Sequence, residues 1–524
     1  MRRAFCLLLT LVLLLPVLAG CGRKSNDFYY DIQTAPINLD PQSASDHSSQ
    51  LVISSIFEGL MRVARDGSLE PAAAETYMVS DNGLTYRFFL REDGAWSDGT
   101  PVTADDFVYA FRRLFNPDTN APQVGQFFCI ENGEEVLNEI LPAESLGVEA
   151  EDDHTLVIRL ESSNSRFLYL LTTAPSMPCN EKFFTDTRGK YGLSGKTIMG
   201  NGPFYLYSWE KDALRLKRNA EYSDPAMTAE SVKFNILSAM DDPGDIRTRF
   251  LEGRTSAAAL DSLSGLSEEV HWSESENTTW GLIFNQKDSP FAEKAIRQAL
   301  LYALDFGGGE NALPEGAERA YAVIPHNIRM GEQSYRKLAG EDLLPDRDAD
   351  KAISVWQEGM TALGMTQLTG LSIIMPEGAG HETAFGYLSQ VWQRDLSLYL
   401  TVEVLPAAEY KKRLASGDFD VALTALTGAY NSPHAILELF QQHTGSVWAV
   451  RSSAYDALLS EAEAEADTDV ALALYAEAEQ LLIDEAVFLP LYNQSEYFVT
   501  SESVTGVIYD FDSKIVNFEY AVQN

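Results

Sequence analysis

Basic residues are scarce in this chain of 524 residues, and their scarcity excludes several classes of protein. There are 39 lysines and arginines against 77 aspartates and glutamates, which gives a formal net charge of −38. Proteins that bind nucleic acid or adsorb to anionic lipid present a basic face, so we expect neither partner for the folded body. The excess of acid favours solubility through mutual repulsion and does not by itself indicate a cation site.

Cysteine is also rare. The chain has four cysteines and contains no CxxC pair or Cys/His cluster of the kind typical of a metal site. Cys129 and Cys179 lie well beyond the N-terminal segment, and outside the cytoplasm they could form a disulfide. They could equally be two separate buried thiols, and the sequence leaves both alternatives open.

Catalytic motifs are missing or incomplete. The sequence GKT at 195–197 lacks the first glycine of a phosphate-binding loop, because Lys190 stands at that position. His381 begins a zinc-protease motif, but Phe385 stands where the second histidine ligand is required. No GxSxG elbow occurs, and the seven histidines are scattered along the chain. We therefore predict that this protein is not an enzyme and that it needs neither a metal nor another cofactor.

Long apolar runs are absent except near the N-terminus. After a short basic start, residues 4–18 form an apolar stretch that is too short for a comfortable membrane span. It ends in LAGC at 18–21, which resembles the lipobox of bacterial lipoproteins. The resemblance predicts a signal peptide over 1–20, an acylated Cys21, and a linker to residue 27. Lipid alone would then hold the protein at the outer face of the cell membrane or in the periplasm. A plain secretory signal or an uncleaved anchor is the alternative.

Material for a folded core is plentiful. Hydrophobic residues make up 45% of the chain and aromatic residues 11%. A single core stops growing at about 250–300 residues, so we expect two or three domains. Alternating apolar residues predict strands at 85–90 and 155–160, and an apolar stripe of helical period predicts a helix that begins at Pro290. Because strand and helix signals mix without a single repeat, the predicted fold class is α/β.

A series of motifs follows at a specific spacing along the chain. They are LDP at 39–41, IFEGL at 56–60, EPAAAE at 70–75, DNGLTYRFFLR at 81–91, WSDGTPVTADDFVY at 96–109, GPFY at 202–205, IRQAL at 296–300, FDV at 419–421 and YAEAE at 475–479. In these motifs the chain resembles the extracytoplasmic solute-binding lipoproteins of peptide ABC importers, the oligopeptide- and dipeptide-binding proteins of solute-binding family 5. We expect most motif residues, Trp96 among them, to be structural.

The resemblance implies a two-lobed clamshell that closes over its ligand. Lobe I would be discontinuous and would combine residues 28–56, 187–282 and 494–524. An extra domain would be inserted into it at 57–186, and lobe II would span 283–493. The implied function is capture of oligopeptides and their delivery to an ABC import permease by a monomeric receptor. The alternatives are a receptor of the same fold for a non-peptide solute and a secreted, lipid-anchored hydrolase.

The same resemblance implies where the ligand would lie. The first lobe would meet the peptide backbone, a hinge-proximal strand would lie near it, and a second-lobe strand and loop would hold its N-terminal end. The implied ligand-binding residues are Asp46, His47, Ser48, Trp280, Asn285, Thr424, Leu426, Gly428, Ala429, Tyr430 and Asn431.

One part of this region departs from the family pattern. Oligopeptide-binding relatives typically read Trp-x-x-Asp-Tyr, and the aspartate holds the α-ammonium of the peptide. This chain has Leu426 and Ala429 at those two positions, so both the indole and the carboxylate are missing. Either the protein does not bind the ammonium in this way, or a neighbouring acid such as Glu438 or Asp418 replaces the anchor.

The lipobox generates a first prediction, that Cys21 alone holds the protein at the membrane. Stable anchoring needs two or more acyl chains, because a single myristoyl chain binds only marginally. Cys21→Ser should leave folding intact and move the protein to the soluble fraction or leave an uncleaved precursor. Fractionation of cells with detection of the mature chain checks this. A mature, membrane-bound Cys21→Ser product would contradict the prediction.

Overall fold

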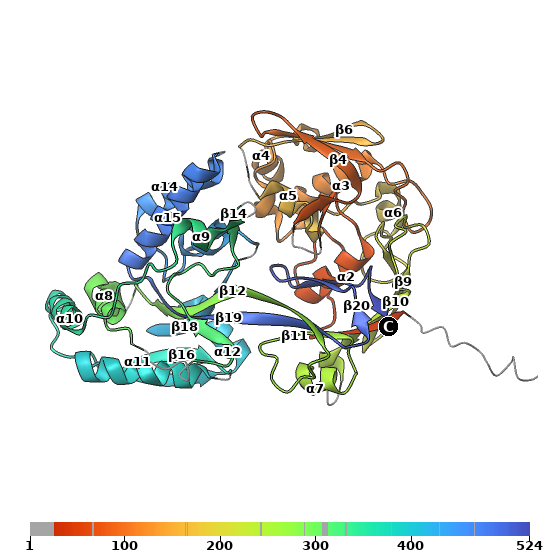
Figure 1. The fold of residues 1–524 in the computed structure, drawn as a ribbon. Coiled ribbons are helices and arrows are strands. Elements are labelled where there is room, and N and C mark those ends of the chain that lie inside the picture. Colours follow the sequence, from red (N-terminus) through yellow and green to blue (C-terminus); the bar gives the residue numbers. More distant parts are fainter. Residues whose placement is uncertain are drawn as a thin grey trace, which may run out of the picture.

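The computed structural model describes residues 26–524, apart from 65–67, 163, 165, 241–243, 288, 306–312, 331–332, 379, 429 and 466. The predicted signal peptide and Cys21 lie outside the described residues. Figure 1 shows a lobe that carries α8, α10, α11, α14 and α15, facing a body that carries α2 to α6. No described helix has the length and apolar character that a membrane span requires.

The body contains two four-stranded sheets. The first has the order β1-β10-β9-β8, in which β1 pairs in parallel with β10 although the two lie about 200 residues apart in the sequence. The second has the order β4-β5-β7-β6 and is antiparallel. The bounds are β1 (Asp27–Ile32), β4 (Ala74–Val79), β5 (Thr85–Leu90), β6 (Val148–Asp152), β7 (Thr155–Arg159), β8 (Phe204–Trp209), β9 (Ala213–Arg218) and β10 (Ser231–Ile236).

The helices of the body cover these sheets. They are α2 (His47–Ile56), α3 (Ala104–Leu114), α4 (Gly133–Leu137), α5 (Phe167–Leu170), α6 (Glu181–Asp186) and α7 (Ile246–Leu251). The start of α3 explains the WSDGT motif. Asp106 accepts hydrogen bonds from the backbone N–H of Thr103 at 2.9 Å and from the indole Nε1 of Trp96 at 3.0 Å. Trp96 is fully buried, as expected for a structural residue.

The second lobe is built on a seven-stranded sheet. Its order is β11-β19-β12-β18-β16-β17, and β13 pairs with β19 off this path. The strands are β11 (Ala257–Leu260), β12 (His271–Phe284), β13 (Ala317–Arg319), β16 (Leu371–Pro376), β17 (Leu400–Leu405), β18 (Val421–Thr427) and β19 (Phe488–Thr500). Strands β12 and β19 are the longest, and they run from the second lobe into the body (Figure 1).

Helices flank this sheet on both faces (Figure 1). They are α8 (Lys294–Tyr302), α9 (Tyr335–Ala339), α10 (Ala349–Leu363), α11 (His381–Leu396), α12 (Ala407–Ser416), α13 (Pro433–Leu437), α14 (Ser453–Ala464) and α15 (Thr468–Asp484). The predicted helix at Pro290 begins later than expected. Pro290 opens a short 3₁₀ turn, and Glu293 is extended and caps α8 through a hydrogen bond from the backbone N–H of Ala295 at 3.3 Å. The apolar stripe then belongs to α8, and the turn before it is separate.

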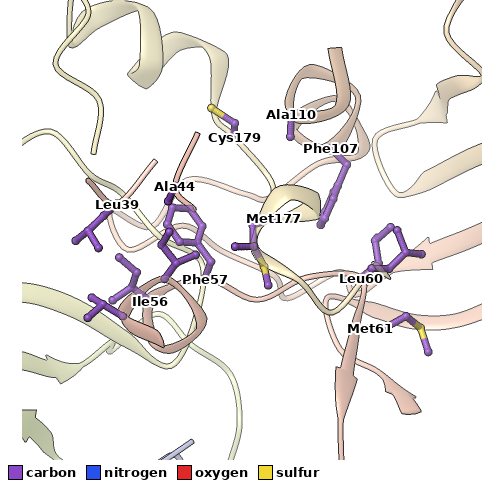
Figure 2. Packing of buried hydrophobic residues seen from close by; sticks show 14 of the residues in the cluster. Leu39, Ala44, Ile56, Phe57, Leu60, Met61, Phe107, Ala110, Met177 and Cys179 are labelled. Carbon is purple, nitrogen blue, oxygen red and sulfur yellow. The ribbon is translucent and has the colours of Figure 1, made fainter. Parts of the chain in front are cut away.

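Two large hydrophobic cores hold the molecule together. One unites both sheets of the body, because Phe28 of β1, Phe88 of β5 and Phe107 of α3 belong to one buried cluster. Figure 2 shows part of this cluster, with Phe107 on α3 and Ile56 on α2. The other lies within the second lobe. The two-lobed α/β fold that the resemblance implied therefore has one core for each lobe.

Cys129 and Cys179 do not form a disulfide in this structure. Cys129 and Cys179 are both free, and Cys179 lies 3.5 Å from Nη1 of Arg113. Burial raises the pKa of both thiols to about 11, so both are protonated and unreactive at neutral pH.

A buried group of carboxyl groups fixes the C-terminal segment to the body. Glu519 is only 2% exposed and lies 3.8 Å from Nη1 of Arg62. Nearby, the Tyr222 hydroxyl donates a 2.6 Å hydrogen bond to Glu58. Burial raises the pKa of Glu519 to about 7, against the opposing effect of Arg62. A carboxyl whose pKa is raised on folding stabilises the fold at low pH, and this contribution is lost as the pH rises through 7.

Glu519→Gln should therefore stabilise the protein at pH 8 by up to about 3 kcal/mol and change little at pH 4, because the amide removes the buried charge. Urea unfolding at both pH values measures this. Glu70→Gln is the matched control, since Glu70 also pairs with Arg62, at 2.7 Å, but is 44% exposed. Destabilisation of Glu519→Gln at pH 8 would contradict the prediction.

Candidate ligand site between the lobes

A loop near the C-terminus lies between helix α2 of the body and the long strand β12. It connects β21 (Ile508–Asp510) with β22 (Ile515–Asn517), and β22 packs against α2. Asp510 shapes the loop by accepting hydrogen bonds from the backbone N–H of Asp512 at 3.0 Å and from the Ser513 hydroxyl at 2.5 Å. On the side of the long strands, the Asn277 side chain donates to the carbonyl of Phe511 at 3.0 Å. We call residues 511–514 the junction loop.

The start of α2 lies beside this loop and carries three predicted site residues. Asp46 caps the helix by accepting from the backbone N–H of Ser49 at 2.9 Å, so its carboxylate is already occupied. Ser48 is buried. His47 is the exposed residue of the three. Partial burial of its ring lowers its pKa, the charge of Asp46 opposes this, and Lys514 of the junction loop lowers the pKa further. His47 is therefore the neutral side chain of this group that a ligand could contact.

Strand β18 is paired along the whole of one edge but, among the described residues, along only part of the other. We call the unpaired part the open edge. Strand β12 pairs with β18 along its whole length, from Val421 to Thr427. On the other side, β16 pairs only with Val421 and Ala422, and the Tyr410 hydroxyl donates to the carbonyl of Leu423 at 2.7 Å. Within the described part of the chain, the segment from Leu423 to Thr427 has no strand along this second edge. Apart from the Leu423 carbonyl, which Tyr410 occupies, the backbone groups on this edge are therefore available to pair with an extended ligand.

The residues after β18 contact the body. Arg166 lies over the ring of Tyr430 at 4.3 Å and within 3.5 Å of the Glu438 carboxylate. The ring of Tyr169, on α5, lies 5.9 Å from that of Tyr430. Gly428 has little room, because an added Cβ would lie 2.9 Å from the carbonyl oxygen of Tyr430. This segment is thus part of a direct contact between the two lobes.

Asn431 links the second lobe to the junction loop. Its side-chain oxygen accepts from the backbone N–H of Arg329 at 2.6 Å, and its nitrogen donates to the carbonyl of Asn327 at 3.1 Å. The side chains of Asn277 and Asn431 lie close enough to the Asp512 carboxyl to lower its pKa. The structure therefore brings together the predicted residues of α2 and the predicted residues after β18 around one loop.

Two predicted residues lie apart from this loop. The Trp280 ring packs 4.4 Å from that of His381, which shares a 2.6 Å hydrogen bond with the Tyr492 hydroxyl. Asn285 is buried and donates to the carbonyl of Gly417 at 3.1 Å. Asn285 thus holds the chain at the far end of β18. Ala429, the position of the missing carboxylate, lies outside the described residues.

The two acids that could replace the missing carboxylate already have basic partners. Asp418 is 75% exposed and lies 3.5 Å from Arg413, before β18 begins. Glu438 lies between Arg166 and His434, at 3.5 and 3.6 Å. A third acid, Asp512, also lies in this region, near Asn431. Sequence reasoning missed it because 77 acidic residues offer no way to single out one, and only folding brings residue 512 next to residue 431.

Asp512 has an unusual electrostatic setting. Burial, followed by the charge of Asp510, raises its pKa to about 7, while Asn277, Lys514 and Asn431 oppose this. Among the described residues no basic side chain lies within ion-pair distance of it, and Lys514 is paired with Glu496. No group of three or more metal-ligating side chains in the described part of the chain could hold a metal ion.

Comparisons with known proteins place this architecture in a family. The model of the bacterial extracellular solute-binding proteins, family 5, matches residues 68–448. The dipeptide-binding protein DppE of Bacillus subtilis is 27% identical, over 92% of this chain and 89% of its own length. The oligopeptide-binding protein OppA of the same organism is 25% identical, over 91% and 89%.

A solved structure of a related protein has the same fold. The substrate-binding domain of an oligopeptide ABC transporter from Bacillus anthracis superposes with a TM-score of 0.75 at 25% identity, covering 96% of this chain and 99% of that one. These matches confirm the family resemblance, the two-lobed fold and the prediction that the chain is a binding protein and not an enzyme.

The contact between Arg166 and Tyr430 generates a prediction about lobe closure. Arg166→Gln removes a partly buried ion pair and a cation–π contact, each worth about 0.5–1 kcal/mol. The ratio of the closed to the open form should fall about 5–30-fold, and the radius of gyration from small-angle X-ray scattering should increase. Arg87→Gln is the control, because its pair with Glu151 is exposed and lies within one sheet of the body. Equal scattering curves for the Arg166→Gln and Arg87→Gln variants would count against the contact.

Proposed function

Because this chain belongs to family 5 of the bacterial extracellular solute-binding proteins, we propose that it is a receptor that captures short peptides and delivers them to an ABC import permease. The names of its relatives, which are dipeptide- and oligopeptide-binding proteins, support this class of ligand. The predicted acylation of Cys21 would keep the receptor at the membrane, close to the permease, and the receptor would act as a monomer.

The observation that carries the proposal is the open edge of β18. A peptide that adds to this edge as an extra strand would pair its backbone with the residues from Leu423 to Thr427. Affinity of this kind depends on main-chain hydrogen bonds and not on the identity of the side chains. At about 3.3 Å per residue, this edge accommodates a segment of about four to five ligand residues.

Closure would complete the site. The edge belongs to the second lobe, whereas His47 and the junction loop belong to the body, so a peptide on β18 would be covered when the lobes meet. Covering the ligand removes water from its hydrogen bonds and commits it to transport. The residues Asp46 to Ser48 would act from the side of the body, with His47 as the exposed contact.

A second class of ligand is favoured by one observation. The indole and the carboxylate that are typical of oligopeptide-binding relatives are both replaced here. Leu426, which is 5% exposed, stands in place of the indole, and Ala429 has no carboxylate. A non-peptide solute of similar size would suit such a site as well. Native mass spectrometry of the purified protein distinguishes the two, because a trapped ligand reveals its class through its mass.

Peptide binding should stabilise the protein and compact it. At a ligand concentration of 100 times Kd the stabilisation is about 2.7 kcal/mol, which a thermal melt detects readily. If the edge is used, methylation of one ligand backbone nitrogen that faces β18 should weaken binding about tenfold, while methylation of the next nitrogen along should not. Calorimetry on such a series checks this. Equal affinities throughout the series, or identical scattering curves for free and saturated protein, would contradict the proposal.

A further inference from the structure

The sheet β1-β10-β9-β8 buries one of its faces and exposes the other. Phe28 and Phe234 belong to the core of the body and are fully buried. On the opposite face Tyr29, Tyr205 and Tyr207 are 45%, 37% and 55% exposed. Figure 1 shows β9 and β10 at the side of the body that lies away from the second lobe. The exposed face is therefore separate from the candidate ligand site.

Basic side chains lie between these tyrosines. In the register of the sheet, Lys233 of β10 stands between Tyr29 of β1 and Arg215 of β9. Two residues further along β9, Lys217 stands opposite Tyr205 of β8. Alternate residues of a strand share one face, so these five side chains belong to the exposed face. The face is thus both aromatic and basic.

The sixth residue of this surface is Tyr207, the extra residue of a β-bulge in β8. Nζ of Lys217 lies 3.5 Å from the centroid of the Tyr207 ring. Tyrosine and lysine each combine an apolar body with a polar or charged tip, and this combination is typical of surfaces that lie at the level of lipid headgroups. We call Tyr29, Tyr205, Tyr207, Arg215, Lys217 and Lys233 the outer face.

The charge of the outer face is not balanced by the protein. The neighbouring Arg218 pairs with Glu230. Within the described part of the chain, no carboxylate lies within ion-pair distance of Arg215, Lys217 or Lys233. Arg215 and Lys233 are directly opposed on neighbouring strands, where like charges destabilise a sheet and an acid at either position would stabilise it. Because acidic residues are so abundant in this chain, the like-charged pair indicates that an anion from outside approaches this face.

The chain enters the sheet in the same row of residues. Asp27, the first residue of β1, stands beside Ser231, which stands beside Lys217. At the spacing of neighbouring strands, Asp27 therefore lies about 10 Å from Lys217. Six residues of chain lead from Cys21 to Asp27, and even fully extended they span at most about 20 Å. An acyl anchor on Cys21 would thus keep the outer face near the lipid headgroups.

On the basis of the proposed acylation of Cys21, we propose that the outer face docks on a membrane surface that contains anionic lipid. The three cations pair with lipid phosphates, and the three tyrosines lie among the headgroups. The acyl chains supply attachment, and the outer face supplies orientation. The body is then held in one orientation at the membrane in which the receptor would meet its permease.

The net charge of −38 does not prevent this contact. At physiological ionic strength, interactions between exposed charges are screened beyond about 8 Å, so the charges of the docked face dominate. The composition predicted no contact between the folded body and anionic lipid, because a total over the chain does not show which charges a sheet gathers. On this one face the fold gathers cations that the total conceals.

The test is hydroxyl-radical footprinting of the purified, acylated protein in vesicles of phosphatidylcholine alone or of an equal mixture with phosphatidylglycerol. Each basic residue near an anionic surface shifts the equilibrium about fivefold, so three shift the ratio of docked to undocked protein about 100-fold. Oxidation of Tyr205 and Tyr207 should therefore fall several-fold on the anionic vesicles. Tyr399 of the second lobe, which is 59% exposed, should be oxidised equally on both. Salt at about 1 M, where the Debye length is about 3 Å, should abolish the difference.

A variant that combines Arg215→Gln, Lys217→Gln and Lys233→Gln should lose the protection of both tyrosines on anionic vesicles. Its melting temperature should be no lower than that of the wild type, because the like-charged pair is removed. A thermal melt therefore separates the loss of docking from a loss of folding.

The matched control combines Lys337→Gln, Lys411→Gln and Lys412→Gln, which removes the same charge from exposed lysines of α9 and α12 in the second lobe. This control should keep the protection of the wild type. Equal oxidation of the wild type on both kinds of vesicle would overturn the inference, as would protection that survives in the outer-face variant or disappears in the control.

Other occupants of the outer face are distinguished in the same assay. Protection by soluble polyphosphate on neutral vesicles would assign the face to a free polyanion, and protection that accompanies cross-linked dimers on neutral vesicles would assign it to a second copy of the chain. Either result would overturn membrane docking. Calorimetry with a bound peptide should give the same Kd for both variants, so these outcomes leave peptide capture intact. A purified mature chain without acyl groups would instead contradict the proposed anchoring, and the inference would fail with it.

Discussion

The pairing of β12 with β19 is the interaction on which the rest of the molecule depends. These two strands run antiparallel from His271 and Thr500 in the body to Ile283 and Phe488 in the second lobe. Their ladder is interrupted between Ser275 and Thr278 and again at Gly281, where an added Cβ would lie 2.3 Å from the Phe488 ring. Irregularities of this kind bend and twist a strand pair, so the connection between the lobes is paired along most of its length and still able to bend.

This connection explains why the site forms where it does. Strand β18 is the next strand after β12 in the same sheet, so its open edge is held at a fixed distance from the hinge. Asn277, on β12 within the first irregularity, is 1% exposed and holds the junction loop by its backbone. The parts of the body and of the second lobe that face each other are therefore both positioned by one strand.

The acidic composition has a different meaning at the surface and in the interior. Most acids are exposed and keep the chain soluble, as its charge of −38 indicates. Glu519 and Asp512 are different, because burial raises the pKa of each to about 7. Glu519 has Arg62 close by and fixes the C-terminal segment, whereas no basic side chain of the described residues lies within ion-pair distance of Asp512. The same residue type thus has an ion-pair partner in one place and none among the described residues in the other.

Local sequence determined much of this protein. The alternation of apolar residues at 85–90 became β5 with Tyr86, Phe88 and Leu90 buried, because a strand has a period of two. The motifs, which depend on turns and buried side chains such as Trp96, were sufficient to identify the family. Only the tertiary structure decided the surroundings of Asp512, since its neighbours at 277 and 431 are distant in the sequence. It also decided that Pro290 opens a separate turn and that the two cysteines are not bonded, because those outcomes depend on distances between segments that no local pattern encodes.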